Sequence, residues 1–102
     1  MKEEKRFLEI LNSSLDDILN GNFSSVKDKI KEFEEDDDLK ESIDKISKLS
    51  DTLNYLIEDS NTMNEAAKLG KLDVRIDANK YQGDFAKITN GFNDTVDKLL
   101  QI

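Results

Sequence analysis

Apolar residues recur along the chain in alternating steps of three and four, the spacing of a helix with one apolar stripe. The first such stretch spans residues 2–20 and contains Leu8, Leu11, Leu15 and Ile18. The second spans about residues 38–69 and contains Leu39, Ser42, Ile46, Leu49, Leu53, Leu56, Ser60, Met63 and Ala67. Because the alternation is sustained over several heptads, it predicts a long coiled-coil helix. We call these positions, together with those of the last helix below, the seam.

A third helix is predicted near the C-terminus. Asp84 is expected to be its N-cap, because a carboxylate accepts hydrogen bonds from the first free amides of a helix. Asn93 lies beside the apolar stripe of this helix, so its side chain either bonds across helices or is solvated. The seam positions of the helix are Phe85, Ile88, Phe92, Val96 and Leu99.

Glycines mark the ends of the helices, because the chain contains no proline. Gly21 is expected to end the first helix and Gly70 the long one, since glycine tolerates the left-handed conformation that follows a helix. The connector after Gly70, about residues 70–83, alternates apolar and charged residues, which is typical of an extended chain.

The earlier connector, about residues 20–38, has a less decisive pattern. Val26, Ile30 and Phe33 would share one helix face, so this connector has room for a helical turn or two. Ser24 or Ser25 would then be the N-cap. We expect a connector that is partly helical.

The chain repeats itself. Residues 18–23 match residues 67–72, and residues 39–53 match residues 85–99. Each repeat is a helix, a glycine, a connector and a second helix, and the first connector is the longer. We therefore predict two units, residues 2–53 and residues 54–102, that share a continuous central helix.

Composition narrows the possible functions. The net charge is −8 and 37% of the residues are charged, so binding to nucleic acid or to anionic lipid is disfavoured. Hydrophobic residues make up 36%, which is low for a self-contained globule and favours helices that close against a partner. No apolar stretch approaches ~18 residues and no signal peptide follows Met1, so a cytoplasmic segment is expected.

Side chains suited to catalysis or metal binding are scarce. The chain has no Cys and no His, which removes zinc sites of the usual kind, thiol nucleophiles and the Ser-His-Asp triad. The acidic run 34–38 lacks the ligand spacing of a calcium loop and is better explained as charge at a helix start. Adjacent carboxylates on a helix do not face each other. We expect neither an enzyme nor a bound cofactor or metal.

A resemblance to a known family rests on three strings, residues 65–77 (EAAKLGKLDVRID), 80–88 (KYQGDFAKI) and 91–97 (GFNDTVD). These strings resemble the tandem HAMP region of bacterial methyl-accepting chemotaxis proteins, over roughly the last forty residues. The resemblance implies parallel homodimeric four-helix coiled-coil bundles, stacked as two HAMP units. It implies a module that relays conformational change by switching between two packings of its helices.

The same resemblance implies roles for connector residues. Gly70 makes the turn out of the helix, and Leu72 and Ile76 plug into the bundle. Gly21 and Phe23 fit the corresponding roles in the first unit, where Val26 or Ile30 is the second plug.

The implied partners are a second copy of the chain, an upstream sensor domain, and a downstream signalling hairpin that contacts a histidine kinase and its adaptor. The segment would belong to the cytoplasm, including the cytoplasmic part of a membrane-anchored receptor. Three alternatives stay open at this point. The chain could be a passive coiled-coil scaffold, a monomeric helical adaptor, or the HAMP linker of a sensor histidine kinase.

Overall fold

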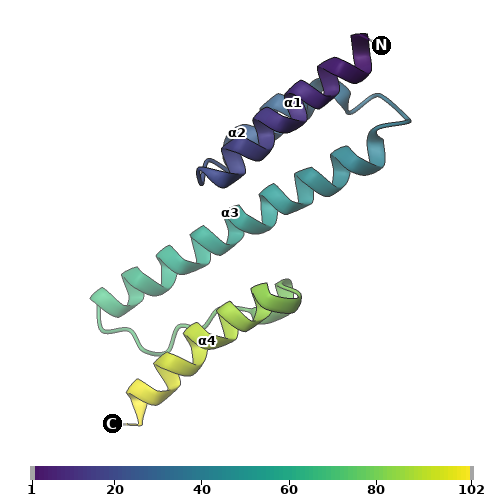
Figure 1. Ribbon diagram of the computed structural model, residues 1–102. Helices are drawn as coiled ribbons and strands as arrows, with labels where there is room; N and C mark the ends of the chain where they lie inside the picture. The colour runs from purple at the N-terminus through teal and green to yellow at the C-terminus, as the bar shows by residue number, and fades with distance from the viewer. Residues whose placement is uncertain (1, 102) are drawn as a thin grey trace. The chain divides into compact units, whose positions relative to one another are not determined.

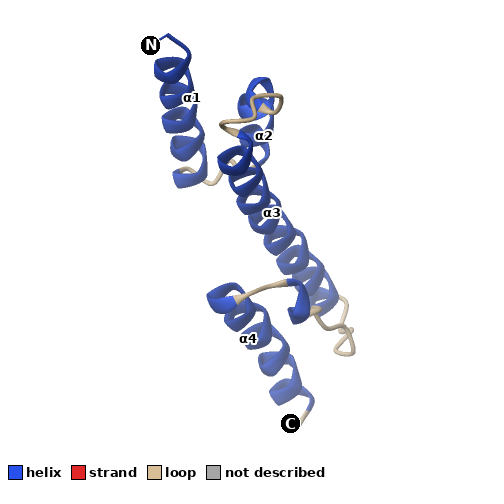
Figure 2. Ribbon diagram, turned by 90° about the vertical axis from the view of Figure 1, so that its right-hand side faces the viewer, coloured by secondary structure: helices blue, strands red, loops and turns tan. Residues whose placement is uncertain are grey.

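The computed structural model describes residues 2–101, and of Lys2 and Glu3 only the backbone. Every regular element in this range is helical, and residues 2–101 contain no strand (Figures 1 and 2). The prediction of an all-α fold is therefore confirmed. The elements are α1 (Lys2–Leu19), α2 (Ser24–Ile30), η1 (Lys31–Phe33), α3 (Lys40–Lys68), η2 (Ala78–Lys80) and α4 (Gly83–Leu100).

Contacts within the chain divide it into two units, Met1–Asn54 and Tyr55–Ile102. The helix α3 runs across the boundary and contributes to both units. Connector 1 joins α1 to α3 and contains α2 and η1, whereas connector 2 joins α3 to α4 and contains η2. Each unit thus consists of a helix, a connector and a second helix.

The end of α1 is a tight turn closed by two backbone hydrogen bonds. Gly21 has a φ of 80°, in the left-handed region. Its N–H donates to the carbonyl of Ile18 at 3.0 Å, and the N–H of Asn22 donates to the carbonyl of Asp17 at 2.7 Å. This pair of bonds is the Schellman motif, which satisfies carbonyls that a helix end would leave free.

The unit 2 end of α3 has the same motif. Gly70 has a φ of 73°. Its N–H donates to the carbonyl of Ala67 at 3.1 Å, and the N–H of Lys71 donates to the carbonyl of Ala66 at 2.8 Å. Both glycines therefore stop their helices as the sequence predicts, and the repeat extends to backbone hydrogen bonding.

Connector 1 supplies most of the core of unit 1. Its residues Val26, Ile30 and Phe33 are 0%, 2% and 8% exposed, and they pack with Ile43 of α3. The expected helical turn or two is α2, seven residues long, followed by the turn η1. Neither serine caps α2, because Phe23 occupies the N-cap position. The partly buried hydrophobic residues around this core are Phe7, Ile10, Ile18, Leu39 and Ile46.

Connector 2 is not helical between residues 71 and 77, and it contributes to the core of unit 2 without forming an α-helix. Met63 of α3 packs with Ile76 and Tyr81 of the connector, and all three are buried. The helix α4 begins at Gly83 with Gln82 at the N-cap position. The prediction that Asp84 caps this helix is wrong, because the N-cap position is two residues earlier. Asp84 lies in the first turn, where its charge favours the helix dipole.

Two serines are fully buried in unit 1 and differ in their hydrogen bonding. Ser50 of α3 donates its hydroxyl to the carbonyl of Phe23 at 2.5 Å, and so fastens the start of connector 1. Ser14 of α1 is equally buried, and within residues 2–101 its hydroxyl finds no hydrogen-bond partner. A buried donor without a partner costs stability.

This difference predicts opposite effects of the same substitution. Ser50→Ala should lower the free energy of unfolding by about 1 kcal/mol, and Ser14→Ala should leave it unchanged or raise it by up to ~1 kcal/mol. The gain in helix propensity from serine to alanine applies to both and cancels in the comparison. Urea denaturation followed by circular dichroism measures both values. Equal losses would mean that the Ser14 hydroxyl has a partner after all.

A second matched pair tests the turn at Gly70. No heavy atom lies within 4 Å of a Cβ added at Gly70 or at Gly91, so neither alanine meets a steric clash. Gly70→Ala should still cost about 1–2 kcal/mol, because an L-residue is strained in the left-handed region. Gly91→Ala, inside α4, should gain about 0.5–1 kcal/mol. Thermal unfolding would contradict the assignment if both substitutions stabilised the chain.

Candidate functional site

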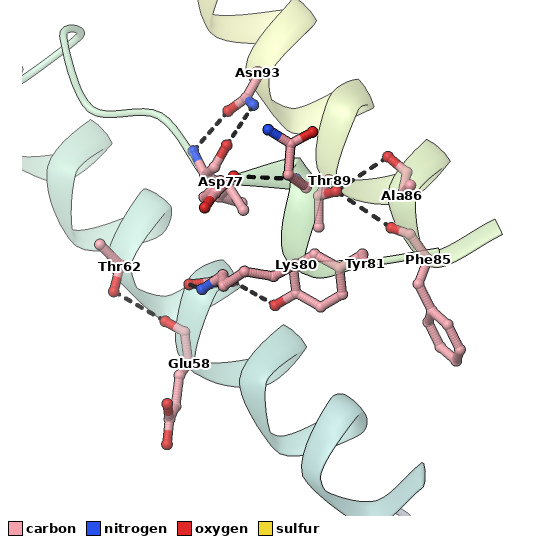
Figure 3. Close-up of polar contacts among 12 residues, drawn as sticks. Glu58, Thr62, Asp77, Lys80, Tyr81, Phe85, Ala86, Thr89 and Asn93 are labelled. Atoms are coloured by element: carbon pink, nitrogen blue, oxygen red, sulfur yellow. Dashed lines mark hydrogen bonds and ion pairs between the residues drawn. The ribbon is translucent and has the colours of Figure 1, made fainter. Parts of the chain in front are cut away.

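Connector 2 is clasped to α4 by the side chain of Asn93 (Figure 3). Its Oδ1 accepts a hydrogen bond from the backbone N–H of Ile76, and its Nδ2 donates to the carbonyl of the same residue, both at 2.8 Å. The sequence left Asn93 either bonding across helices or solvated, and its partner is instead the connector backbone. Because Ile76 is buried, these bonds satisfy two peptide groups that have no helix or sheet to pair with.

Arg75 adds a second link from connector 2 to α4. Its Nε donates to Asp97 Oδ1 at 2.9 Å, and another guanidinium nitrogen lies 2.8 Å from the same oxygen. A third nitrogen donates to the carbonyls of Leu72 and Val74, at 2.7 and 2.8 Å. The guanidinium therefore braces the connector against itself and against the helix. Sequence reasoning missed this role, because Arg75 and Asp97 are far apart in the chain.

On its other side, connector 2 is attached to α3 through Asp59. The phenol of Tyr81 donates a hydrogen bond to Asp59 Oδ2, and Lys80 Nζ lies 3.1 Å from the same oxygen (Figure 3). Burial and the bond to Asp59 raise the pKa of the Tyr81 phenol, so it remains a hydrogen-bond donor. The Lys80 ammonium also lies 5.8 Å from the centre of the Tyr81 ring. Sequence reasoning gave none of the three this role.

Connector 1 is attached to α1 at two places. Lys29 Nζ lies 2.5 Å from Asp17 Oδ2, and the Ser25 hydroxyl donates to the same oxygen at 2.8 Å. These two contacts lower the pKa of Asp17, because both stabilise its charged form. Nearer the N-terminus, Arg6 donates to both oxygens of Glu32, at 2.9 and 3.0 Å.

Connector 1 also reaches α3. The Ser50 hydroxyl holds the Phe23 carbonyl, and Lys27 Nζ lies 2.6 Å from Asp51 Oδ1. Each connector is therefore tied by polar contacts to both helices of its own unit. These contacts are ion pairs and hydrogen bonds between partners on neighbouring elements.

The residues that the resemblance casts as plugs are buried to different degrees. Ile76 is 7% exposed and belongs to the core of unit 2, whereas Leu72 and Phe23 are only partly buried. Val26 and Ile30, the alternatives for a second plug in unit 1, are both in the core at 0% and 2% exposure. The longer connector thus inserts two residues where one was expected.

The predicted seam is divided between covered and open positions. Ten of its apolar or serine positions are buried or partly buried in one chain: Leu11, Ile18, Leu39, Ile46, Leu53, Leu56, Ser60, Met63, Phe85 and Val96. The others are exposed: Leu8, Leu15, Ser42, Leu49, Ala67, Ile88, Phe92 and Leu99. The open positions include large side chains on α1, α3 and α4.

Other features of the described residues add little chemistry. Residues 2–101 contain no group of three or more acidic side chains arranged to hold a metal ion, and none of their helices is long and apolar enough to cross a bilayer. A groove of about 630 Å³ lies between α1, η1 and the residues just before α3. Its Arg6 and Glu32 pair with each other, and Leu8 and Leu39 on its wall belong to the seam.

The clasp on Ile76 can be tested by truncating it. Asn93→Ala should lower the free energy of unfolding by about 2 kcal/mol, since both buried peptide groups of Ile76 lose their partner. Asn90→Ala, one turn away on an exposed position of α4, is the matched control and should change stability by less than ~0.5 kcal/mol. Chemical denaturation measures both, and equal values for the two would show that the clasp contributes nothing.

Comparison with known proteins gives no further guide to what the chain does. No protein-family model, no curated protein and no solved structure matches it. An assignment of function then depends on the chain's own residues: two helices ended by the same glycine motif, two connectors tied to both of their helices, and large apolar side chains left open at seam positions.

Proposed function

We propose that the chain is a signal-relay module of the HAMP type, in which two copies form parallel four-helix bundles. The observation that carries the proposal is a second apolar stripe on each helix. One stripe is covered by the connector of the same chain, and the other, at seam positions, stays partly exposed within that chain. A second copy, contributing two helices per unit, would cover it.

The two stripes are distinct on α1. Phe7, Ile10 and Ser14 face the core of unit 1, whereas Leu8 and Leu15 are 55% and 43% exposed. With about 3.6 residues per turn, the centres of these stripes lie roughly a third of a turn apart. Connector 1 covers only the first.

The helix α4 repeats this arrangement in unit 2. Thr89 and Asn93 lie on the side of the connector, while Ile88, Phe92 and Leu99 are 45%, 36% and 51% exposed. Burying the exposed part of one such side chain contributes roughly 1 kcal/mol. Association costs ~4–15 kcal/mol, so the stripes of both units have to act together.

An interface of such low stability is suited to signal relay. Allosteric coupling between two sites is typically ~1–3 kcal/mol, so two packings of similar energy must be accessible. Small seam residues, Ser42, Ser60 and Ala67, leave room for both packings. The connectors would bias the choice, because each is fixed to both helices of its unit. An upstream sensor domain would shift unit 1, and α3 would pass the shift to unit 2 and to a downstream signalling hairpin.

The first experiment measures molar mass by light scattering over a concentration series. We expect a dimer that dissociates on dilution, with a Kd raised roughly 10- to 100-fold by Phe92→Ser, because both copies lose a buried ring. Leu69→Ser is the matched control: Leu69 is more exposed, at 68%, but lies off the seam. A monomer at every concentration, or a larger effect of Leu69→Ser, would rule out the seam as the interface.

The relay itself is separated from a passive scaffold by a second readout. Since the chain has no cysteine, Lys98→Cys gives a single spin-labelled site in each copy of the dimer. Ser60→Leu, which fills a small seam position, should redistribute the label-to-label distances at the end of α4. An unchanged distribution would leave only the scaffold function standing.

A further inference from the structure

The side-chain contacts of connector 2 go to a different helix at each end of the segment 75–81. Those of residues 75 and 76 go to α4, through Asp97 and the Asn93 clasp. Those of residues 80 and 81 go to α3, through Asp59. Among the described contacts, no hydrogen bond or ion pair joins residues 75–76 to α3, and none joins residues 80–81 to α4. The connector therefore has one anchor for each helix.

The anchor to α3 belongs to a locally closed turn, residues 77–81. Asp77 caps η2 by accepting the N–H of Asn79 on Oδ1 at 3.1 Å, and its carbonyl accepts the N–H of Lys80 at 3.3 Å. The N–H of Tyr81 donates to the carbonyl of Ala78 at 3.1 Å. These bonds lie within residues 77–81, so this turn keeps its own hydrogen bonds when either neighbouring helix shifts.

The two anchors also differ in chemistry. The Asn93 clasp holds backbone groups of a buried residue, which water cannot satisfy without opening the core. The Asp59 anchor joins side chains, and Asp59 and Lys80 keep 20% and 46% of their side-chain surface exposed. Solvent can therefore replace the Lys80 contact at little cost, while the Tyr81 ring stays in the core.

We propose that connector 2 is a jointed link: residues 72–76 move with α4, the hydrogen-bonded turn 77–81 moves with α3 through Asp59, and the chain flexes where the two parts meet, between residues 76 and 77. The link lets α3 shift against α4 without breaking either anchor. For its role in signalling, this inference rests on the proposed function. It identifies the segment of unit 2 that accommodates a change in helix packing.

Amide hydrogen exchange read by NMR tests the joint, because each anchor protects its own amides. Asn93→Ala should speed exchange of the Ile76 amide roughly tenfold or more, the equivalent of one lost hydrogen bond, and leave the Lys80 and Tyr81 amides unchanged. Tyr81→Phe should speed exchange of the Lys80 and Tyr81 amides several-fold and leave Ile76 unchanged. Amides in the middle of α4 report any change in global stability.

Two controls match these substitutions. Asn90→Ala and Tyr55→Phe make the same chemical changes at exposed positions and should alter neither set of amides. If either Asn93→Ala or Tyr81→Phe speeds both sets together, beyond the change in α4, the connector opens as one body and the joint is refuted. Exchange is measured inside unit 2, so the result holds whether the sample is a dimer or a monomer. Molar mass on the same sample then reports the proposed function separately.

Discussion

The need to satisfy backbone hydrogen bonds outside the long helices governs the architecture of both units. A connector that packs against helices has peptide groups shielded from water, and each requires a partner. Connector 1 meets most of the need internally, because it folds into α2 and η1, and the Ser50 hydroxyl serves the Phe23 carbonyl. Connector 2 is shorter and mostly irregular, so its peptide groups bond to side chains instead. These are the Asn93 amide of α4 and the guanidinium of its own Arg75. Two units with the same plan therefore hold their connectors by different chemistry.

The placement of the connectors also explains why part of the apolar surface of the helices stays exposed. A connector lies along one side of a helix pair and covers one stripe on each helix. Leu8 and Phe92 fall on the neighbouring stripe, which their own unit leaves partly exposed. The apolar surface that remains is narrow and follows the heptad positions, so a helix of matching spacing is the complementary shape.

Much of the fold could be predicted from local pattern. The helix ends at Gly21 and Gly70 follow from residue type, because few other residues accept a positive φ. Periodicity predicted α1, α3 and α4, but the start of α4 was misassigned. Its N-cap residue is Gln82, whose backbone is extended, and not Asp84. The anchors could not be predicted, because pairs such as Tyr81 and Asp59 depend on how distant segments approach. Asn93 was the one useful signal: a polar side chain at the edge of an apolar stripe.

The two ways of holding a connector have unequal consequences for mutational tolerance. In α2 each backbone bond is made by the helix itself, so most exposed positions accept any good helix former. In connector 2 the bonds depend on particular side chains, and Asn93 has no close substitute, because no other side chain of its length offers one donor and one acceptor in a plane. Random substitution should therefore damage unit 2 more often than unit 1. A library selected only for folding would drift faster in the first half of the chain.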